Sequence, residues 1–187
     1  MAETERIWYG RLDARNFGAE SLDSFVRRQQ VRRAWRRTAD GWQLVPAEFW
    51  EDWSLAERRE IAADIAAHMG RDQSAFGAFS DGRLVGFVTV SHRLFGVSAR
   101  YAELVCFQVS EPYRGRGIGR RLFGMAVAEM EIIGAERLYI SSFCAEETQA
   151  VYRALGCRPA SEINAELALE EPKDVPLEYV PQSGKKI

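Results

Sequence analysis

The sequence predicts an α/β fold in which a mixed central sheet carries helices on both faces. Three observations support this prediction. Some segments place apolar residues at helical spacing, others are apolar in the manner of strands, and the two kinds follow one another along the chain. With 187 residues, 47% of them hydrophobic and 28% charged, the chain is long enough for a single domain with a sizeable core.

The N-terminal part is expected to hold one strand followed by helical segments. Residues 5–12, ERIWYGRL, are a candidate strand. Residues 18–37 are polar and strongly helix-forming, but their apolar register slips, so two shorter helices fit as well as one long helix. Residues 38–53 have the composition of a turn-rich, aromatic connection.

A helix and three strands are expected next. Residues 54–70 predict a helix because Ser54 and Glu57 have the spacing of a capping box and a glycine ends the segment. Residues 74–91 predict a β-hairpin because an Asp-Gly pair separates two apolar runs. Residues 99–109, ARYAELVCFQV, predict a further strand.

The C-terminal part alternates between helices and strands. Residues 118–133 carry an apolar stripe at helical spacing, and residues 137–143 are a short, buried strand. Residues 146–155 predict another helix, closed by a glycine. Residues 157–180 suit two more strands around an acidic loop that contains proline.

A glycine- and arginine-rich turn, PYRGRGIGRRLFG at residues 112–124, lies between the predicted strand and the helix that follows. Unpaired N–H groups at a helix N-terminus favour phosphate, and glycine lets the backbone approach it closely. Two well-known phosphate loops do not match. A Walker loop needs lysine and then Ser or Thr after its last glycine, and GxGxxG needs glycine where the chain has Arg120.

The pattern Arg114-x-x-Gly117-x-Gly119 resembles the acetyl-CoA loop of the GNAT family of N-acetyltransferases. The segment AVYRALGCRP at residues 150–159 resembles a later signature of the same family, and the likeness is good over residues 72–160. The resemblance implies a single GNAT-type domain with a mostly antiparallel sheet of about seven strands. It divides the chain 1–187 into an acceptor side at 1–70, an acetyl-CoA-binding core at 72–160 and C-terminal strands at 161–187.

The same resemblance implies which residues bind acetyl-CoA. Backbone amides of the loop hold the pyrophosphate, and amides of the preceding strand stabilise the thioester oxygen as charge develops on it. Ser142 stands where many family members have asparagine, so one contact with CoA is absent or altered. The implied cofactor-binding residues are Phe107, Gln108, Val109, Arg114, Gly115, Arg116, Gly117, Ile118, Gly119, Arg120 and Ser142.

Two side chains are candidates for the chemistry. Glu103 lies in a mostly apolar strand, where desolvation raises the pKa of a carboxyl group, so it is the candidate base that takes the proton of the amine. The alternative is a buried glutamate that pairs with an arginine and only supports the structure. Tyr152 matches the tyrosine that the family places near the CoA sulfur and is the candidate acid. The alternative is a packing tyrosine that anchors the cofactor.

Composition argues against several other classes. The chain has only two histidines, His68 and His92, and three cysteines without CxxC spacing, so we expect no metal site and no Ser-His-Asp triad. A formal net charge of −2 disfavours a general nucleic-acid binder, and we expect the arginines of residues 27–37 to lie on a solvated helix face. No apolar run reaches the roughly 18 residues of a membrane span, and the start does not resemble a signal peptide, so a cytoplasmic monomer or homodimer is expected.

The expected function is therefore transfer of an acetyl group from acetyl-CoA to the primary amine of a small, cationic acceptor by direct attack. Aromatic residues of 42–53 and the acidic turn at 170–174 are expected to frame the acceptor, because carboxylates and aromatic faces attract cations. Three alternatives remain open at this point: an acyl-CoA-binding sensor without catalysis, a protein or peptide N-acetyltransferase, and a nucleic-acid-binding module built on the arginine run.

Overall fold

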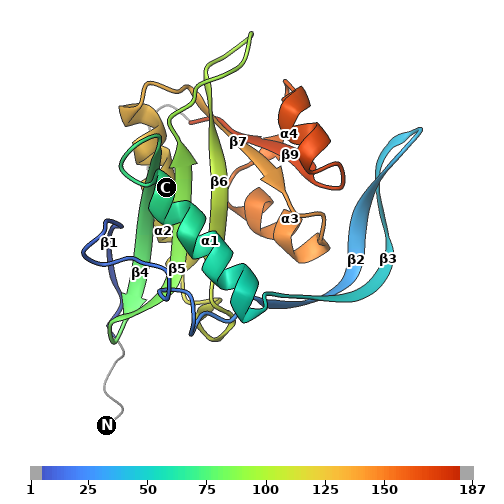
Figure 1. Cartoon of the computed structure of the whole chain (residues 1–187). Coiled ribbons are helices and arrows are strands. Elements are labelled where there is room, and N and C mark those ends of the chain that lie inside the picture. Colours follow the sequence, from blue (N-terminus) through green and yellow to red (C-terminus); the bar gives the residue numbers. More distant parts are fainter. Residues whose placement is uncertain (1–5, 182–187) are drawn as a thin grey trace.

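A computed structural model describes residues 6–181 of the chain, and Figure 1 shows its arrangement. The strands are β1 (Trp8–Arg11), β2 (Arg28–Thr38), β3 (Gly41–Asp52), β4 (Gln73–Ser80), β5 (Arg83–Ser91), β6 (Tyr101–Val109), β7 (Arg137–Ser142), β8 (Arg158–Pro159) and β9 (Val175–Tyr179). The helices are α1 (Leu55–His68), α2 (Ile118–Ile132), α3 (Glu146–Ala154) and α4 (Ala165–Glu170).

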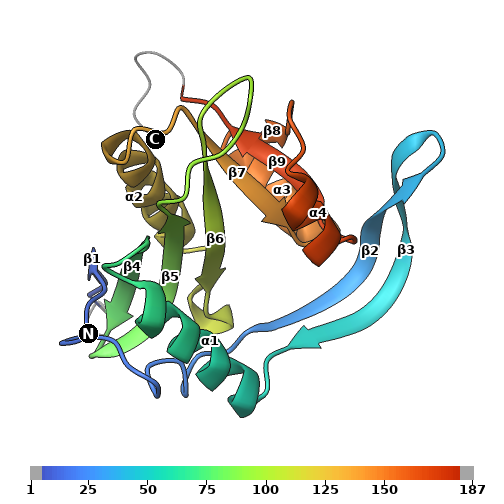
Figure 2. The ribbon, with the colours of Figure 1, turned by 45° about the horizontal axis from the view of Figure 1, so that its top comes forward.

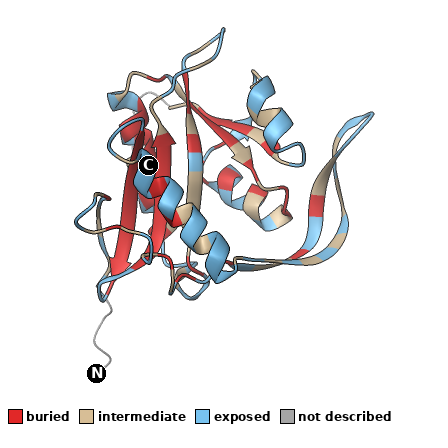
Figure 3. Cartoon of the chain, viewed as in Figure 1, coloured by how far each residue is buried: buried red, intermediate tan, exposed pale blue. Residues whose placement is uncertain are grey.

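Seven strands form one mixed sheet in the order β1-β4-β5-β6-β7-β9-β8. Its neighbouring strands are antiparallel except for β6 and β7, which are parallel. Helices α1 and α2 lie on opposite faces of β4 and β5, and both faces of these two strands are buried (Figures 1 and 3). The predicted fold class, a mostly antiparallel mixed sheet with helices on both faces, is confirmed.

Alternation of side chains along the strands creates two cores, one on each face of the sheet. On β5, Phe87 belongs to the core under α1, whereas Val88 belongs to the core under α2. Gly86 lets α2 lie close to the sheet, because a Cβ atom there would come within 2.9 Å of the Leu122 side chain. The two cores hold the long strands in register and fix β6, the strand on which the candidate site is built.

Local signals in the middle of the chain are confirmed. Ser54 and Glu57 form the expected reciprocal capping box at the start of α1. The turn between β4 and β5 is Asp81-Gly82, with φ of 46° and 74°, which is the left-handed conformation that a tight hairpin requires.

The prediction of helices within residues 18–37 is wrong. Residues 28–38 form strand β2, and the expected connection at 38–53 is largely strand β3, so the two make a long antiparallel hairpin. Ala34 and Trp35 pair with the segment after β7, where the Trp35 N–H donates to the Cys144 carbonyl over 2.8 Å. Because cross-strand pairing and this contact outweigh intrinsic helix propensity, the arginines lie along a hairpin and not around a helix.

The C-terminal tail contains the two expected strands, β8 and β9, and also a helix that the prediction missed. Helix α4 begins after Asn164, whose side chain accepts hydrogen bonds from the N–H groups of Glu166 and Leu167. An Asn followed by Ala, Glu and Leu is a helix-start signal that could have revealed it.

Glu178 on β9 is a buried carboxylate that ties the C-terminal strands to the sheet. It accepts hydrogen bonds from the Tyr101 hydroxyl at 2.7 Å and from the guanidinium groups of Arg158 at 2.8 Å and Arg137 at 3.2 Å. Burial alone raises the pKa of this carboxyl group, but the hydrogen bonds outweigh burial and lower the pKa to about 2.

Candidate active site

Strands β6 and β7 separate partway along their length. They pair only at three positions, from Tyr101 opposite Arg137 to Glu103 opposite Tyr139. Beyond this point β6 continues beside β5, whereas β7 pairs with β9 and runs away from β6 (Figure 2). The edge of β6 that faces β7 is therefore open after Glu103, and its backbone groups are not used in the sheet there.

Two amides of β6 point toward this open edge. The Ser110 N–H donates to the Val85 carbonyl on the β5 side, and N–H groups alternate between the two edges of a strand. The Gln108 N–H consequently also points to β5, and the N–H groups of Phe107 and Val109 point toward the divergence. Of the three amides predicted to stabilise the thioester oxygen, Phe107 and Val109 have the required direction and Gln108 does not.

The glycine-rich turn follows β6 and opens helix α2. Gly115 and Gly117 have φ of 75° and 80°, and a Cβ atom at either position would meet no other atom within 4 Å. The first amide bonded within the helix is that of Arg121, which donates to the Gly117 carbonyl over 3.2 Å. The N–H groups from Gly117 to Arg120 thus have no acceptor within the helix, an arrangement that favours an anion, and the built Cβ positions of Gly115 and Gly117 face open space.

Other residues of the turn hold its shape. Arg114 donates through Nε to the Val109 carbonyl over 3.0 Å and through Nη1 to the Arg28 carbonyl over 2.8 Å, so its side chain joins the end of β6 to β2. Arg116 donates to the Pro112 carbonyl and lies over the Tyr113 ring. Gly119 packs near Phe107 with 3.4 Å between a built Cβ atom and the ring, which lets α2 approach β6 closely.

Tyr152 of α3 reaches β6 across the divergence. Its ring lies 6.1 Å from the ring of Phe107, centroid to centroid, and its side chain is buried. Burial raises the pKa of the phenol far above its usual range, so the hydroxyl remains a proton donor at every physiological pH. The structure therefore places Tyr152 close to Phe107, whose amide faces the same opening.

Glu103 lies at the last paired position of β6, where the opening begins. Burial raises the pKa of its carboxyl group, and the negative charges of Glu170 and Glu166 on α4 raise it further, while Arg93 opposes them. A second carboxyl group, that of Asp174, has its pKa raised to about 6 by burial and by Glu171 and Glu51. Glu103 and Asp174 are thus two carboxyl groups whose charged forms are disfavoured by burial and by neighbouring carboxylates.

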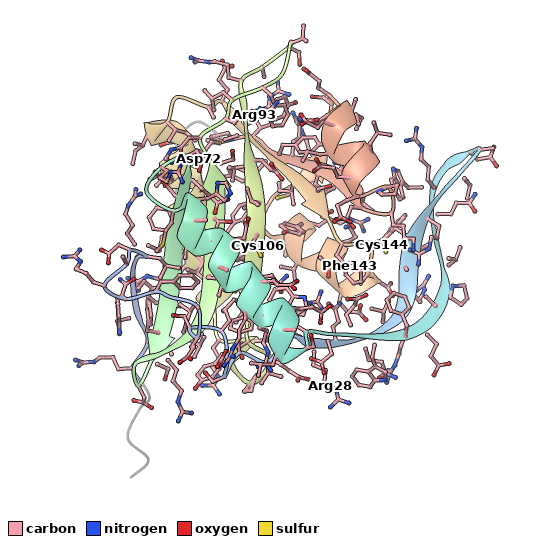
Figure 4. All side chains as sticks on the ribbon, viewed as in Figure 1. Arg28, Asp72, Arg93, Cys106, Phe143 and Cys144 are labelled. Carbon is pink, nitrogen blue, oxygen red and sulfur yellow. The ribbon has the colours of Figure 1, made fainter. Side chains whose placement is uncertain are left out.

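A cavity of about 350 Å³ lies between α1 and the face of the sheet that α1 covers. It borders β6 at Val105 and Cys106, between Glu103 and Phe107, and contains Gln73, whose buried Oε1 has no hydrogen-bond partner in residues 6–181. Its other lining residues are Glu60, Ile61, Asp64, Ile65 and Thr89. Figure 4 marks Cys106 on β6; burial raises the pKa of its thiol to about 12, which makes it a poor nucleophile.

Two predictions about side chains need correction. Ser142 is buried, and its hydroxyl donates to the Val175 carbonyl and accepts from Gln149 Nε2. Because both hydrogen bonds are made within the protein, Ser142 is not among the proposed CoA contacts. The tryptophans of the hairpin do not form a single wall that could frame an acceptor. Trp50 is 54% exposed and stacks with Arg28, whereas Trp42 packs against the core under α2.

Sequence analysis missed Arg27, which is buried at the base of the hairpin. Its guanidinium carbon lies 5.9 Å from the centre of the Trp53 ring and 5.5 Å from that of Phe143, the residue just after β7. The arginine run suggested only exposed side chains, and no sequence signal distinguishes Arg27 from its neighbours.

Comparisons with known proteins identify the family and the fold. The sequence model of the acetyltransferase (GNAT) family matches residues 31–157. The chain belongs to the GNAT family. No curated protein sequence matches it significantly. Among residues 6–181 the structure has no group of three or more His, Cys, Asp or Glu side chains placed to hold a metal ion, and no helix long and apolar enough to cross a membrane.

Solved GNAT structures share the fold over nearly the whole chain. Nourseothricin acetyltransferase superposes with a TM-score of 0.67 at 21% identity, covering 93% of this chain and 98% of its own. PaiA N-acetyltransferase from Thermoplasma acidophilum, solved with coenzyme A, gives 0.56 at 16% identity over 94% and 99%. The ribosomal-protein-S18-alanine N-acetyltransferase from Escherichia coli gives 0.54 at 16% identity over 97% and 99%. At these identities the likeness is one of fold.

Proposed function

We propose that this GNAT protein transfers the acetyl group of acetyl-CoA to the primary amine of a small acceptor that is cationic in water. One observation carries the proposal: the open edge of β6 brings together two free-facing amides, a buried phenol and a carboxyl group of raised pKa, with an anion site at one end. These are the groups that acyl transfer from a thioester to an amine requires.

The loop and β6 supply the cofactor side of the proposed site. The backbone amides of Gly115 to Arg120 bind the pyrophosphate, with the open space above Gly115 and Gly117 admitting it. The amides of Phe107 and Val109 donate to the thioester oxygen, where negative charge grows during attack. Arg114 acts through its hydrogen bonds to Val109 and Arg28, which hold these two groups of amides in place.

Proton transfer falls to Glu103 and Tyr152. Glu103, deprotonated, takes a proton from the ammonium group, and the free amine then forms the N–C bond to the acetyl carbon. The C–S bond breaks, and the electron pair goes to sulfur, where the hydroxyl of Tyr152 donates to the thiolate. The nitrogen then loses its second proton, which restores the phenol of Tyr152, and Glu103 releases the first proton to solvent, so the products are an amide, the free thiol and one proton.

The charges around the opening favour a cationic acceptor. The negative charges of Glu170 and Glu166 disfavour the ionised form of Glu103, and a protonated amine beside Glu103 relieves this repulsion. The cavity beside Val105 and Cys106 lies next to the same stretch of β6 and offers an apolar space for the body of the acceptor.

A panel of amines tests the proposal. The full-length protein is incubated with acetyl-CoA and polyamines, amino acids, aminoglycosides or lysine peptides, and release of the CoA thiol is followed. We expect turnover with small amines and little with peptides. Turnover with peptides alone indicates a protein N-acetyltransferase, and tight binding of acetyl-CoA without turnover on any class indicates a sensor; either outcome rejects the proposal.

A further inference from the structure

Arg27 has a feature that the proposed transfer does not use. Its side chain is only 6% exposed, and its Nε and Nη1 atoms are fully buried without a hydrogen-bond partner in residues 6–181. Its guanidinium lies over the faces of two aromatic rings, those of Trp53 and Phe143. A buried guanidinium normally has its N–H groups paired with a carboxylate or carbonyl, because an unpaired buried charge is costly.

The surroundings do not supply the missing anion. Glu51 and Asp52 act on Arg27 from a distance, and within the described part of the chain neither forms an ion pair with it. Arg114 contributes a second positive charge nearby. The guanidinium is therefore a preformed cationic site that is stacked on rings and fixed in position but has no counter-ion.

The location of Arg27 connects this cation to the proposed reaction. Figure 4 labels Phe143, which follows the end of β7, and Cys106 on β6. Arg27 lies over the Phe143 ring and also acts electrostatically on Cys106, so its guanidinium lies near the place where the two strands have separated. Cys106 is three residues beyond Glu103, which is roughly 10 Å along a strand. Unlike Nε and Nη1, the Nη2 atom is not among the fully buried nitrogens that lack a hydrogen-bond partner.

We propose that Arg27 binds an oxyanion of the acceptor, a carboxylate or a phosphate, so that the acceptor is a small amine that also carries such a group. The inference rests on the proposed function and narrows it. The amine lies among Glu103, Glu166 and Glu170, and the oxyanion lies at Arg27, several bonds away. A planar guanidinium matches both carboxylate and phosphate, and its rings exclude water from the contact.

Matched acceptor pairs test this inference. Lysine is compared with cadaverine, ornithine with putrescine, and phosphoethanolamine with ethanolamine, each with acetyl-CoA and the full-length protein. The first two pairs report on carboxylate and the third on phosphate. We expect kcat/KM to be at least about tenfold higher for the anionic member of one type of pair, since a charge-assisted bond that is well shielded contributes a factor of this size.

The variants Arg27→Met and Arg27→Lys locate the effect, with Arg37→Met on the exposed part of β2 as a matched control. Arg27→Met should reduce kcat/KM at least tenfold for the member of the pair that carries a carboxylate or phosphate. For the member that lacks this group, kcat/KM should change less than about twofold, and the affinity for acetyl-CoA should stay the same. Arg27→Lys should retain part of the preference, because it keeps the charge and loses the fork. Arg37→Met should behave as wild type.

Several results would overturn the inference. They are equal kcat/KM for both members of every pair in the wild type, a preference that survives in Arg27→Met, or a loss of acetyl-CoA affinity in that variant. If Arg27→Met does not fold, Arg27→Lys and the wild-type preference decide the question. If no amine is turned over, the proposed function fails; the pairs are then compared by calorimetry on the CoA-saturated protein, and equal or absent binding rejects the inference as well.

Discussion

Glu103 lies at the start of the open edge of β6, where burial and the charges of Glu170 and Glu166 raise the pKa of its carboxyl group. We expect Glu103→Gln to lower kcat about 10²- to 10⁴-fold at neutral pH, the range of general-base catalysis. The rate of the variant should recover partly at high pH, where solvent deprotonates the amine. Initial rates of thiol release against pH measure this effect.

The pH dependence of the wild-type rate should reflect the raised pKa of Glu103. A base whose pKa is raised becomes protonated earlier as the pH falls, so activity should decline at a higher pH than an ordinary glutamate would give. Glu147→Gln on the exposed face of α3 is the control and should keep the wild-type profile. A Glu103→Gln variant with wild-type rates at neutral pH would remove Glu103 from the mechanism.

Tyr152 donates to the departing sulfur in the proposed mechanism, and its burial keeps the phenol protonated. Tyr152→Phe removes the hydroxyl but keeps the ring against Phe107. We expect kcat to fall about 10- to 100-fold, with little change in acetyl-CoA affinity measured by calorimetry. If affinity falls and kcat does not, Tyr152 anchors the cofactor and is not the acid.

Glu178 on β9 is expected to stabilise the fold without taking part in the proposed reaction. Its pKa is about 2 in the folded protein, below that of an unfolded glutamate, so the unfolded chain binds more protons between these values. The stability that Glu178 contributes is complete above the unfolded pKa and is lost as the pH falls toward 2. Glu178→Gln should lower the free energy of unfolding by about 2–3 kcal/mol at pH 7, because it leaves Arg137 and Arg158 unpaired.

Urea unfolding of Glu178→Gln against pH measures this contribution. The difference between variant and wild type should shrink as the pH is lowered from about 5. Glu131→Gln, on the exposed end of α2, should show no such difference. A difference that is constant with pH would mean that the ionised form of Glu178 is not what stabilises the fold.

At the scale of elements, the turn between β6 and α2 depends on glycine at Gly117, where φ is 80°. Gly117→Ala places a methyl group in the open space above the anion site and costs about 1–2 kcal/mol in backbone strain. We expect acetyl-CoA affinity to fall at least tenfold by calorimetry, with some loss of thermal stability.

Gly82→Ala is the matched control for this variant. Gly82 also has a positive φ, 74°, and open space around it, but it lies in the β4–β5 turn. It should lose similar stability and keep wild-type acetyl-CoA affinity. Equal affinity in Gly117→Ala and Gly82→Ala would show that acetyl-CoA does not bind at the turn.

The elements that could be predicted are those whose local signals agree with their packing. The capping box of α1, the Asp-Gly turn and the apolar stripe of α2 each determine a local conformation that the fold also requires. The β2–β3 hairpin could not be predicted, because its arginine-rich sequence favours helix locally. Pairing with β3 and contact with residues 143–145 make it a strand, and the second of these contacts comes from a distant part of the sequence.

The residues of the candidate site also differ in how well the sequence predicts them. The loop glycines and Tyr152 are recognisable because they match short motifs of the GNAT family, which the sequence resembles at these positions. The role of Gln108 depends on the direction of its backbone N–H, and that of Ser142 depends on the hydrogen-bond partners of its hydroxyl. The local sequence predicts neither of these features. Arg27 differs from the arginines around it only through its burial at the divergence of two distant strands.

At the scale of the whole molecule, the fold separates the two substrates of the proposed reaction. Helix α2, which follows the glycine-rich turn, lies on one face of the sheet, and α1 lies on the other (Figure 2). The cavity is lined by α1 and the face of the sheet that α1 covers. The gap between β6 and β7 is the place where the two sides meet. In the proposed reaction the acetyl group passes directly from thioester to amine in this gap; the raised pKa of the Cys106 thiol, the cysteine on β6, agrees with a route that forms no acetyl-cysteine.

Mass spectrometry after reaction with acetyl-CoA carrying an isotopic label in its acetyl group tests direct transfer most simply. The full-length protein is mixed with labelled acetyl-CoA and an amine from the panel, quenched at short times, and both the protein and the small molecules are weighed. We expect the label to appear as an amide of the amine, with the protein mass unchanged at every time. Label on the protein before it reaches the amine, or release only as free acetate, would contradict direct N-acetyl transfer.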